Sequence, residues 1–201
     1  MWTFATKLVY TRDMKKNPAI ILVGIKHSGK STLGKLLANK LNCPFVDVDT
    51  VITKITGSSP RDVYLFKGPK GFMDAELNAC IKIYEQLHGK PVVIATGGGI
   101  CDNPEAILKL SSMGRFVMIN APLKLVCDRV FAKAKLYEDG TWEGLPAYIQ
   151  NENPKTEKQA KDIFTQKMTE RVEAYKKLSD LVFEPTKDSI EENVAKLAYI
   201  L

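Results

Sequence analysis

Short apolar runs alternate with amphipathic stretches of helical length along most of this chain. The runs hold about four or five residues and are rich in β-branched side chains. Strands of this kind, separated by helices, are typical of an α/β domain with a mainly parallel sheet. The expected strands are Ala19 to Val23, Pro44 to Val48, Val92 to Ala95, Phe116 to Ile119 and, with the weakest pattern, Leu181 to Phe183.

Helix-start signals fall between the expected strands. Ser59 and Asn103 each precede a proline, an arrangement that favours a capped first turn, and Ser189-x-x-Glu192 matches a capping box. Glycine, proline and asparagine interrupt the pattern from Tyr137 to Pro154. A long irregular segment in a compact enzyme is typical of a mobile lid, which we place at about residues 135–158.

The length fits one domain. With 201 residues, of which 45% are hydrophobic and 26% charged, the chain is long enough for one well-buried core and short for two. We expect a single domain over residues 14–201, preceded by an N-terminal arm, residues 1–13, to which the sequence assigns no role. No run approaches the roughly 18 apolar residues of a membrane helix, and no apolar block marks a secretory signal. These features predict a soluble, cytoplasmic protein, which we expect to be a monomer without a membrane partner.

The charge pattern argues against a nucleic-acid partner. Although the net charge is +6, the 29 basic residues are dispersed among 23 acidic ones and form no dense run. A small polyanion such as ATP accounts for the charge equally well. The four cysteines are widely spaced, so neither a disulfide framework nor a zinc site is expected.

A phosphate-binding loop follows the first expected strand. The run Gly24-x-x-x-x-Gly29-Lys30-Ser31 lies between that strand and an expected helix, which is the context that such a loop needs. Glycines let backbone N–H groups turn onto phosphate oxygens, the lysine brings a positive charge, and the serine offers a hydroxyl to Mg²⁺. The predicted ATP contacts are Gly24, His27 (through its backbone), Ser28, Gly29, Lys30, Ser31 and Thr32.

Two carboxylates end the second expected strand. Asp47 and Asp49 are two residues apart, so in an extended chain they point to the same side, at the edge where ligands of open α/β sheets bind. One can serve Mg²⁺ while the other accepts the proton of an attacking hydroxyl. The alternative is that Asp49 only caps a helix that begins near Val51.

Two further features have weaker signals when taken alone. Gly97, Gly98 and Gly99 follow the third strand and permit a ligand to lie against bare backbone, although a tight turn without a ligand also fits. Arg171 lies in a charged helical stretch and by itself reads as part of a solvated helix face.

Taken together, the motifs resemble those of shikimate kinase, and the resemblance covers nearly the whole chain from Met14. Their order and spacing make the likeness more specific than any one of them. The matching segments are Gly24 to Thr32, Asp47-Val48-Asp49, Thr56-Gly57, Gly71-Phe72-x-x-x-Glu76, Ala95-Thr96-Gly97-Gly98-Gly99, Leu125-x-x-x-Arg129 and Glu170-Arg171-x-x-x-Tyr175.

The resemblance implies a three-layer P-loop kinase fold with a five-stranded parallel sheet, helices on both faces and a lid segment. It implies transfer of a phosphoryl group from ATP, with Mg²⁺, to the 3-hydroxyl of shikimate, a step of aromatic amino-acid biosynthesis. The implied roles are as follows: Lys30 stabilises the transferred group, Ser31 and Asp47 serve Mg²⁺, Asp49 is the base, Gly97 and Gly98 line the substrate site, and Arg171 holds the substrate carboxylate.

The sequence departs from the family pattern at two arginine positions. Met73 stands where a second arginine normally shares the substrate carboxylate, and Leu145 stands where the lid arginine normally reaches the nucleotide. Two other functions therefore stay open: a P-loop kinase for another small hydroxylated acid or polyol, and a nucleotide-binding regulatory homologue with weak transfer. Nearby cations can replace the missing charges: Arg61, Lys67 or Lys70 at the substrate, and Lys133, Lys135 or Lys155 in the lid.

Overall fold

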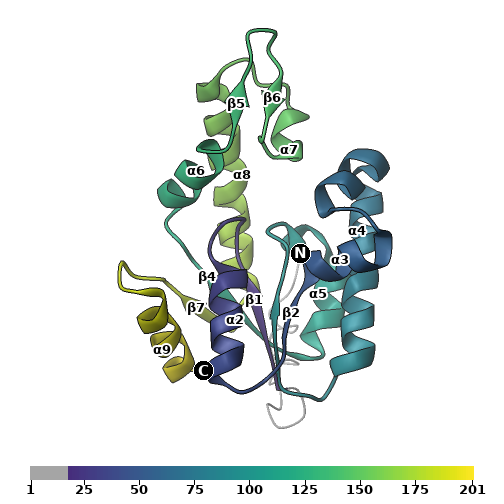
Figure 1. The fold of residues 1–201 in the computed structure, drawn as a ribbon, viewed down its shortest axis with the longest axis vertical. Coiled ribbons are helices and arrows are strands. Elements are labelled where there is room, and N and C mark those ends of the chain that lie inside the picture. The colour runs from purple at the N-terminus through teal and green to yellow at the C-terminus, as the bar shows by residue number, and fades with distance from the viewer. Residues whose placement is uncertain (1–17) are drawn as a thin grey trace.

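A five-stranded parallel sheet forms the centre of the computed structural model, which describes residues 18–201. The predicted arm, residues 1–13, lies outside the described residues. The strands follow the order β2-β3-β1-β4-β7, so the first strand lies in the middle (Figure 1). They are β1 (Ala19–Val23), β2 (Phe45–Asp47), β3 (Val92–Ala95), β4 (Gly114–Ile119) and β7 (Leu181–Phe183). The predicted fold class is confirmed.

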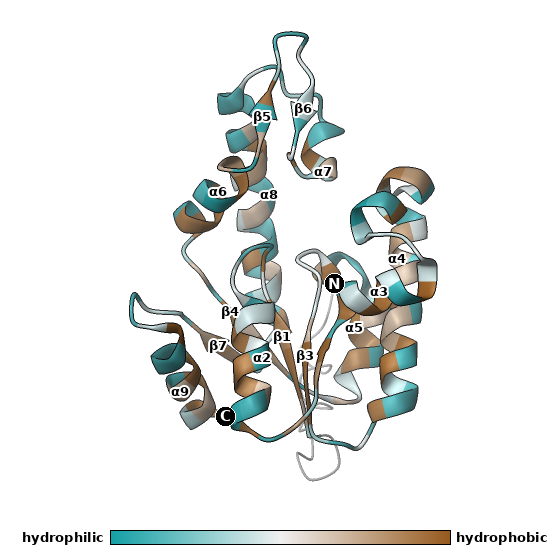
Figure 2. Cartoon of the chain, viewed as in Figure 1, coloured by the Kyte–Doolittle hydropathy of each residue, from teal (hydrophilic) through white to brown (hydrophobic). Residues whose placement is uncertain are grey.

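Helices cover both faces of the sheet, and alternate strand residues supply the two apolar cores. Ile20 and Leu22 of β1 face one layer, whereas Ile21 and Val23 face the other. The helices are α2 (Lys30–Lys40), α3 (Val48–Thr56), α4 (Pro60–Leu87), α5 (Pro104–Ser111), α6 (Leu123–Phe131), α8 (Glu157–Leu178) and α9 (Ile190–Ile200), with the 3-10 helix η1 (Ile100–Asp102). Helices α2 and α9 pack on the first face, and α4, α5 and α8 on the second. The brown central strands in Figure 2 mark this buried layer.

The predicted helix starts are found where the capping signals place them. Ser59 Oγ accepts from the Asp62 N–H at the start of α4, and the side chain of Asn103 accepts from the Ala106 N–H at the start of α5. At α9 the capping box is complete, because Ser189 and Glu192 each bond the other's backbone N–H.

Two strands differ in their boundaries from the sequence prediction, and β2 begins at Phe45 instead of Pro44. The second strand ends at Asp47, because the Asp47 side chain accepts from the Asp49 N–H and begins α3 there. The strand predicted as Phe116 to Ile119 begins earlier, at Gly114, which pairs with Ala19.

The segment predicted as irregular has regular structure. It contains a small antiparallel pair, β5 (Lys135–Leu136) and β6 (Trp142–Glu143), and the short helix α7 (Ala147–Gln150). Strands of two residues are too short to show an alternating pattern, which is why the sequence did not reveal them. In Figure 1 this part stands above the sheet, at the N-terminal end of α8. In residues 18–201, no helix combines the length and the apolar character that a membrane crossing requires.

Candidate active site

The loop after β1 closes into an anion cradle at the N-terminus of α2. Gly24 has φ 137°, and a Cβ atom at this position would lie 2.6 Å from the Ile119 carbonyl oxygen, so only glycine fits. Gly29 has φ 103° and caps α2. Both the helix dipole and the N–H groups of the first turn therefore face the space enclosed by the loop.

Lys30 crosses this cradle. Its ammonium group donates to the carbonyl oxygens of Gly24 and Ile25 at 2.8 and 2.9 Å, and the residue is 7% exposed. Burial lowers the pKa of Lys30 to about 8, although the carboxylates of Asp49 and Asp47 oppose that shift. These hydrogen bonds hold the ammonium group inside the loop, where phosphate oxygens can take the place of the carbonyl oxygens as acceptors.

The two acids meet the cradle from α3 and the end of β2. Ser31 Oγ donates to Asp47 Oδ2 at 2.6 Å, and Asp47 Oδ1 accepts from the Asp49 N–H at 3.0 Å. The premise of an extended chain is wrong, because Asp49 lies in the first turn of α3 and Asp47, not Asp49, is the cap. The helical turn still brings both carboxylates near Lys30, since both charges act on the pKa of that ammonium.

Asp49 has the electrostatic setting of a proton acceptor. Its side chain is open to the cleft, yet partial desolvation raises the pKa of the carboxyl, and the negative charge of Asp47 raises it further. Lys30 and Lys26 act in the opposite direction. A carboxylate with a raised pKa is a better base than an isolated aspartate.

Ser31 and Asp47 fit the coordination habits of Mg²⁺. They offer a hydroxyl and a carboxylate, both hard oxygen donors, already within hydrogen-bond distance of each other. Among the described residues, no group of three His, Cys, Asp or Glu side chains is arranged to hold a metal alone. In phosphoryl transfer, Mg²⁺ usually takes its other ligands from phosphate and water.

The glycine triplet, Gly97 to Gly99, lies between the phosphate cradle and the Asp49 carboxylate. A Cβ atom on Gly98 would lie 2.5 Å from the Lys26 backbone nitrogen, and one on Gly97 would lie 3.2 Å from Asp49 Oδ1. A Cβ atom on Gly99 would lie 3.2 Å from Arg171 Nη2. The P-loop backbone therefore excludes a side chain at Gly98, and little space is left at Gly97 beside Asp49 or at Gly99 beside Arg171.

Arg171 reaches this triplet from α8. Its Nη2 donates to Asp102 Oδ2 at 2.7 Å, and its Nη1 lies 3.5 Å from the Gly98 carbonyl oxygen. The guanidinium carbon also lies 4.9 Å from the centroid of the Tyr148 ring in α7. The side chain is only 18% exposed, so it does not belong to the solvated helix face that its local sequence suggests.

Glu76 is a site residue to which the sequence analysis gave no role. It is 1% exposed; Oε2 accepts from Asn103 Nδ2 at 3.0 Å, and Oε1 has no hydrogen-bond partner. Oε1 lies 3.1 Å from the place of a Cβ on Gly97, beside Asp49. Burial raises the pKa of Glu76 to about 7. The Gly71-Phe72-x-x-x-Glu76 motif contained it, but only the fold shows that it faces the triplet.

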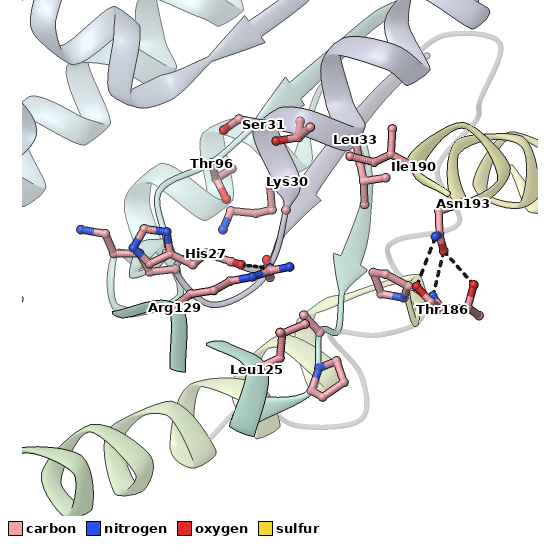
Figure 3. Close-up of a pocket in the computed structure, with 18 of the residues that line it drawn as sticks. His27, Lys30, Ser31, Leu33, Thr96, Leu125, Arg129, Thr186, Ile190 and Asn193 are labelled. Carbon is pink, nitrogen blue, oxygen red and sulfur yellow. Dashed lines mark hydrogen bonds between the residues drawn. The ribbon is translucent and has the colours of Figure 1, made fainter. Parts of the chain in front are cut away.

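A cavity of about 690 Å³ extends from the cradle toward α9. Figure 3 shows His27, Lys30 and Ser31 on one side and Thr186, Ile190 and Asn193 on the other. Its walls include Lys26, His27, Ser28, Gly29, Lys30, Ser31, Thr32, Asp49, Gly98, Leu125, Arg129, Pro185, Thr186 and Asn193. The predicted ATP contacts from His27 to Thr32 therefore line one space, large enough for a small ligand.

Two parts of this cavity were not assigned from the sequence. Arg129 Nη1 donates to the His27 carbonyl oxygen at 2.8 Å and so ties α6 to the loop. Asn193, 4% exposed, accepts from the Thr186 N–H at 2.8 Å and donates to the carbonyl oxygen of Asp188 at 3.1 Å, which shapes the loop before α9 (Figure 3). A single asparagine gave no signal for this role.

The two departures from the family arginines occupy different surroundings. Met73 lies on α4, and its carbonyl oxygen accepts from Asn103 Nδ2. Leu145 is fully buried, and its carbonyl oxygen accepts from Arg61 Nη1 at 3.0 Å. Arg61 thus connects α4 to the lid. Lys67 lies instead by a separate depression between α3 and α4.

Among the lysines suggested for the lid, Lys133 acts on the cradle. Burial lowers the pKa of His27, and the charges of Lys26 and Lys133 lower it further. Lys135 lies over the Tyr137 ring at 4.7 Å, and Lys155 Nζ donates to Asn153 Oδ1 at 2.8 Å, so both contact lid residues.

Comparisons with known proteins bear on the family and the fold. A family model described as shikimate kinase matches residues 26–200. A shikimate kinase of Persephonella marina is 40% identical over 110 residues, which are 55% of this chain and 65% of that protein; the match thus spans less than two thirds of that relative. A Bacteroides thetaiotaomicron shikimate kinase structure has a TM-score of 0.71 at 26% identity and covers 90% of this chain and 97% of its own. A shikimate kinase from Acinetobacter baumannii in complex with shikimate, 22% identical with a TM-score of 0.71 over 93% of this chain and 94% of its own, shares the fold.

The parallel sheet with β1 at its centre and the glycine-rich cradle at the start of α2 define a P-loop kinase fold. The shikimate kinase model matches 26–200, far more than half of the chain. The chain belongs to the shikimate kinase family.

Proposed function

We propose that this protein transfers the terminal phosphoryl group of ATP to the 3-hydroxyl of shikimate, giving shikimate 3-phosphate and ADP. The observation that carries the proposal is that three kinds of group lie close together around Gly97 to Gly99. They are the Lys30 cradle, the Asp47 and Asp49 carboxylates, and the Arg171 guanidinium. Family membership and the similarity to the Persephonella shikimate kinase support the same reaction.

In this proposal, the cradle and the carboxylates divide the work of phosphoryl transfer. The loop amides and Lys30 bind the β and γ phosphates, and Lys30 neutralises charge that develops on the transferred group. Ser31 and Asp47 hold Mg²⁺, which when bound neutralises phosphate charge. Asp49 orients the acceptor hydroxyl and accepts its proton.

The acceptor binds on the other side of the triplet. Gly97 and Gly98 leave room for a ring against bare backbone, and the orphaned Glu76 Oε1 offers an acceptor to a ring hydroxyl. Arg171 binds the carboxylate through its free N–H groups. The lid, through Tyr148 beside Arg171, covers this part of the site and reduces access of water.

A coupled assay of ADP release tests the reaction. Wild-type protein is assayed with MgATP and shikimate, then with a panel of other hydroxylated acids and polyols. Shikimate-dependent ADP release with kcat/KM well above that for the rest of the panel supports the proposal. Turnover with another acceptor alone, or ATP binding without turnover, would contradict it and favour one of the two alternatives. The monomeric state, the cytoplasmic location and the lack of a nucleic-acid partner stay predictions from the sequence.

A further inference from the structure

Asp102 already occupies one N–H edge of the Arg171 guanidinium, the group proposed to bind the acceptor carboxylate. Its Oδ2 lies 2.7 Å from Arg171 Nη2, and that nitrogen lies 3.2 Å from the place of a Cβ on Gly99. Asp102 is 57% exposed in its side chain, whereas Arg171 is 18% exposed. The acid can therefore leave the pair and rehydrate at little cost, while the guanidinium stays in the site.

The charges around the proposed acceptor site make the Asp102–Arg171 pair important for binding an anionic acceptor. The charges of Asp49, Asp102 and Arg171 all act on the pKa of Glu76, so three carboxyl groups and one guanidinium lie near one another. Met73 adds no positive charge at the position where the family pattern has an arginine. An incoming carboxylate thus meets a guanidinium that is already paired with Asp102.

We propose that Asp102 sets the affinity for the acceptor's carboxylate by competing with it for Arg171. This inference rests on the proposed function. An anionic acceptor displaces Asp102 from Nη2 or shares the planar fork of five N–H donors with it, and either arrangement weakens binding relative to an unpaired arginine. A neutral acceptor of the same shape does not compete and is unaffected. Asp102 is therefore a specificity-determining residue that acts through Arg171 and makes no contact with the transferred phosphoryl group.

The test is Asp102→Asn, which keeps the side-chain size and removes the charge. We expect the KM for shikimate to fall about 3- to 10-fold, with kcat and the KM for ATP within about twofold of wild type, since the lost competitor is a partly exposed ion pair. Calorimetry is run in parallel with shikimate and with its methyl ester, which has no negative charge. The variant should bind shikimate more tightly by the same factor and the ester with unchanged affinity.

Glu105→Gln is the matched control, because Glu105 is an exposed acid in the first turn of α5, three residues along the chain from Asp102. It should leave both affinities unchanged. An unchanged or higher KM for shikimate in Asp102→Asn would overturn the inference, since Asp102 would then only hold Arg171 in place. Equal tightening for acid and ester would also overturn it, because the pocket would have changed shape. If wild type binds shikimate without turnover, the proposed function fails while the affinity ratio still decides the role of Asp102; if neither wild type nor variant binds shikimate, both fail.

Discussion

At the residue scale, Asp49 is the side chain on which the chemistry of the proposal depends most. It combines a raised pKa with a position between Lys30 and the triplet. Its neighbour Asp47 has a different task, because it already bonds the Ser31 hydroxyl and the Asp49 N–H. In the proposal, Asp47 is therefore the acid on the metal side and Asp49 the acid on the substrate side.

Replacing Asp49 by Asn should remove the proton acceptor and keep the nucleotide site. We expect kcat for shikimate phosphorylation to fall by about 10² to 10⁴, while the Kd for MgATP changes by less than about threefold. Steady-state kinetics and calorimetry at pH 7 measure the two quantities. Asp162→Asn, an exposed acid on α8, serves as the control. Retained turnover in Asp49→Asn would show that another group accepts the proton.

We expect Glu76 to make the stability of the protein depend on pH. Burial raises its pKa to about 7 from 4.5, so the folded protein binds this proton more tightly than the unfolded chain does. Its contribution to stability is fully present below pH 4.5 and is lost as the pH rises through about 7. Glu76→Gln keeps the bond from Asn103 and removes the ionisation. We expect it to gain on the order of 1 to 3 kcal/mol of unfolding free energy relative to wild type at pH 8, compared with pH 4.5.

Urea denaturation at several pH values between 4.5 and 8 measures this difference. The wild-type curve should fall relative to the variant curve across the interval, and the two should run parallel outside it. Parallel curves throughout would mean that Glu76 titrates normally and is not held in a desolvated site.

At the scale of elements, two cations connect the lid region to its surroundings. Lys133, just before the lid, lies near the cradle, and Arg61 connects the lid to α4. Lys133 adds positive charge near His27, whereas Arg61 Nη1 bonds the Leu145 carbonyl oxygen. Leu145 itself is buried in the apolar core, so it cannot supply the contact that the family arginine makes. Lys133 is thus a candidate for the missing lid cation, whereas the bond from Arg61 holds the backbone at Leu145.

If Lys133 supplies the missing lid charge, Lys133→Ala should raise the KM for ATP about 2- to 10-fold and leave the KM for shikimate nearly unchanged. Lys155→Ala is the matched control, because Lys155 bonds Asn153 within the lid and should not affect ATP. Initial-rate kinetics at physiological salt compare the two variants. Equal effects of both variants, or none, would exclude a specific role for Lys133.

The elements also show where sequence reasoning succeeds. The five strands and the capped helices were predictable because buried β-branched runs and Ser-Pro or Asn-Pro caps are local signals. The β5–β6 pair and α7 were not predicted, because elements of two to four residues are too short to show a periodic pattern. The start of α3 directly after Asp47 was also missed. An aspartate can be the last residue of a strand or the N-cap of a helix, and the sequence alone does not distinguish the two.

At the scale of the whole molecule, the fold assembles the site from distant parts of the chain. The P-loop, the acids of α3, the triplet after β3 and Arg171 of α8 converge at the carboxyl edge of the sheet. The motifs and their order predicted most members of this group. The pairing of Arg171 with Asp102, the burial of Glu76 Oε1 without a hydrogen-bond partner and the loop fixed by Asn193 depend on tertiary contacts. No local pattern could reveal them.

The most direct test of the central claim is the identity of the phosphorylated product. Wild-type protein is incubated with MgATP and shikimate, and the product is analysed by phosphorus NMR and mass spectrometry. The account predicts one new phosphate monoester whose phosphorus couples to the proton on carbon 3, formed in equal amount with ADP and lost in Lys30→Ala. A monoester at another hydroxyl, or ADP formed without any phosphorylated acid, would contradict it.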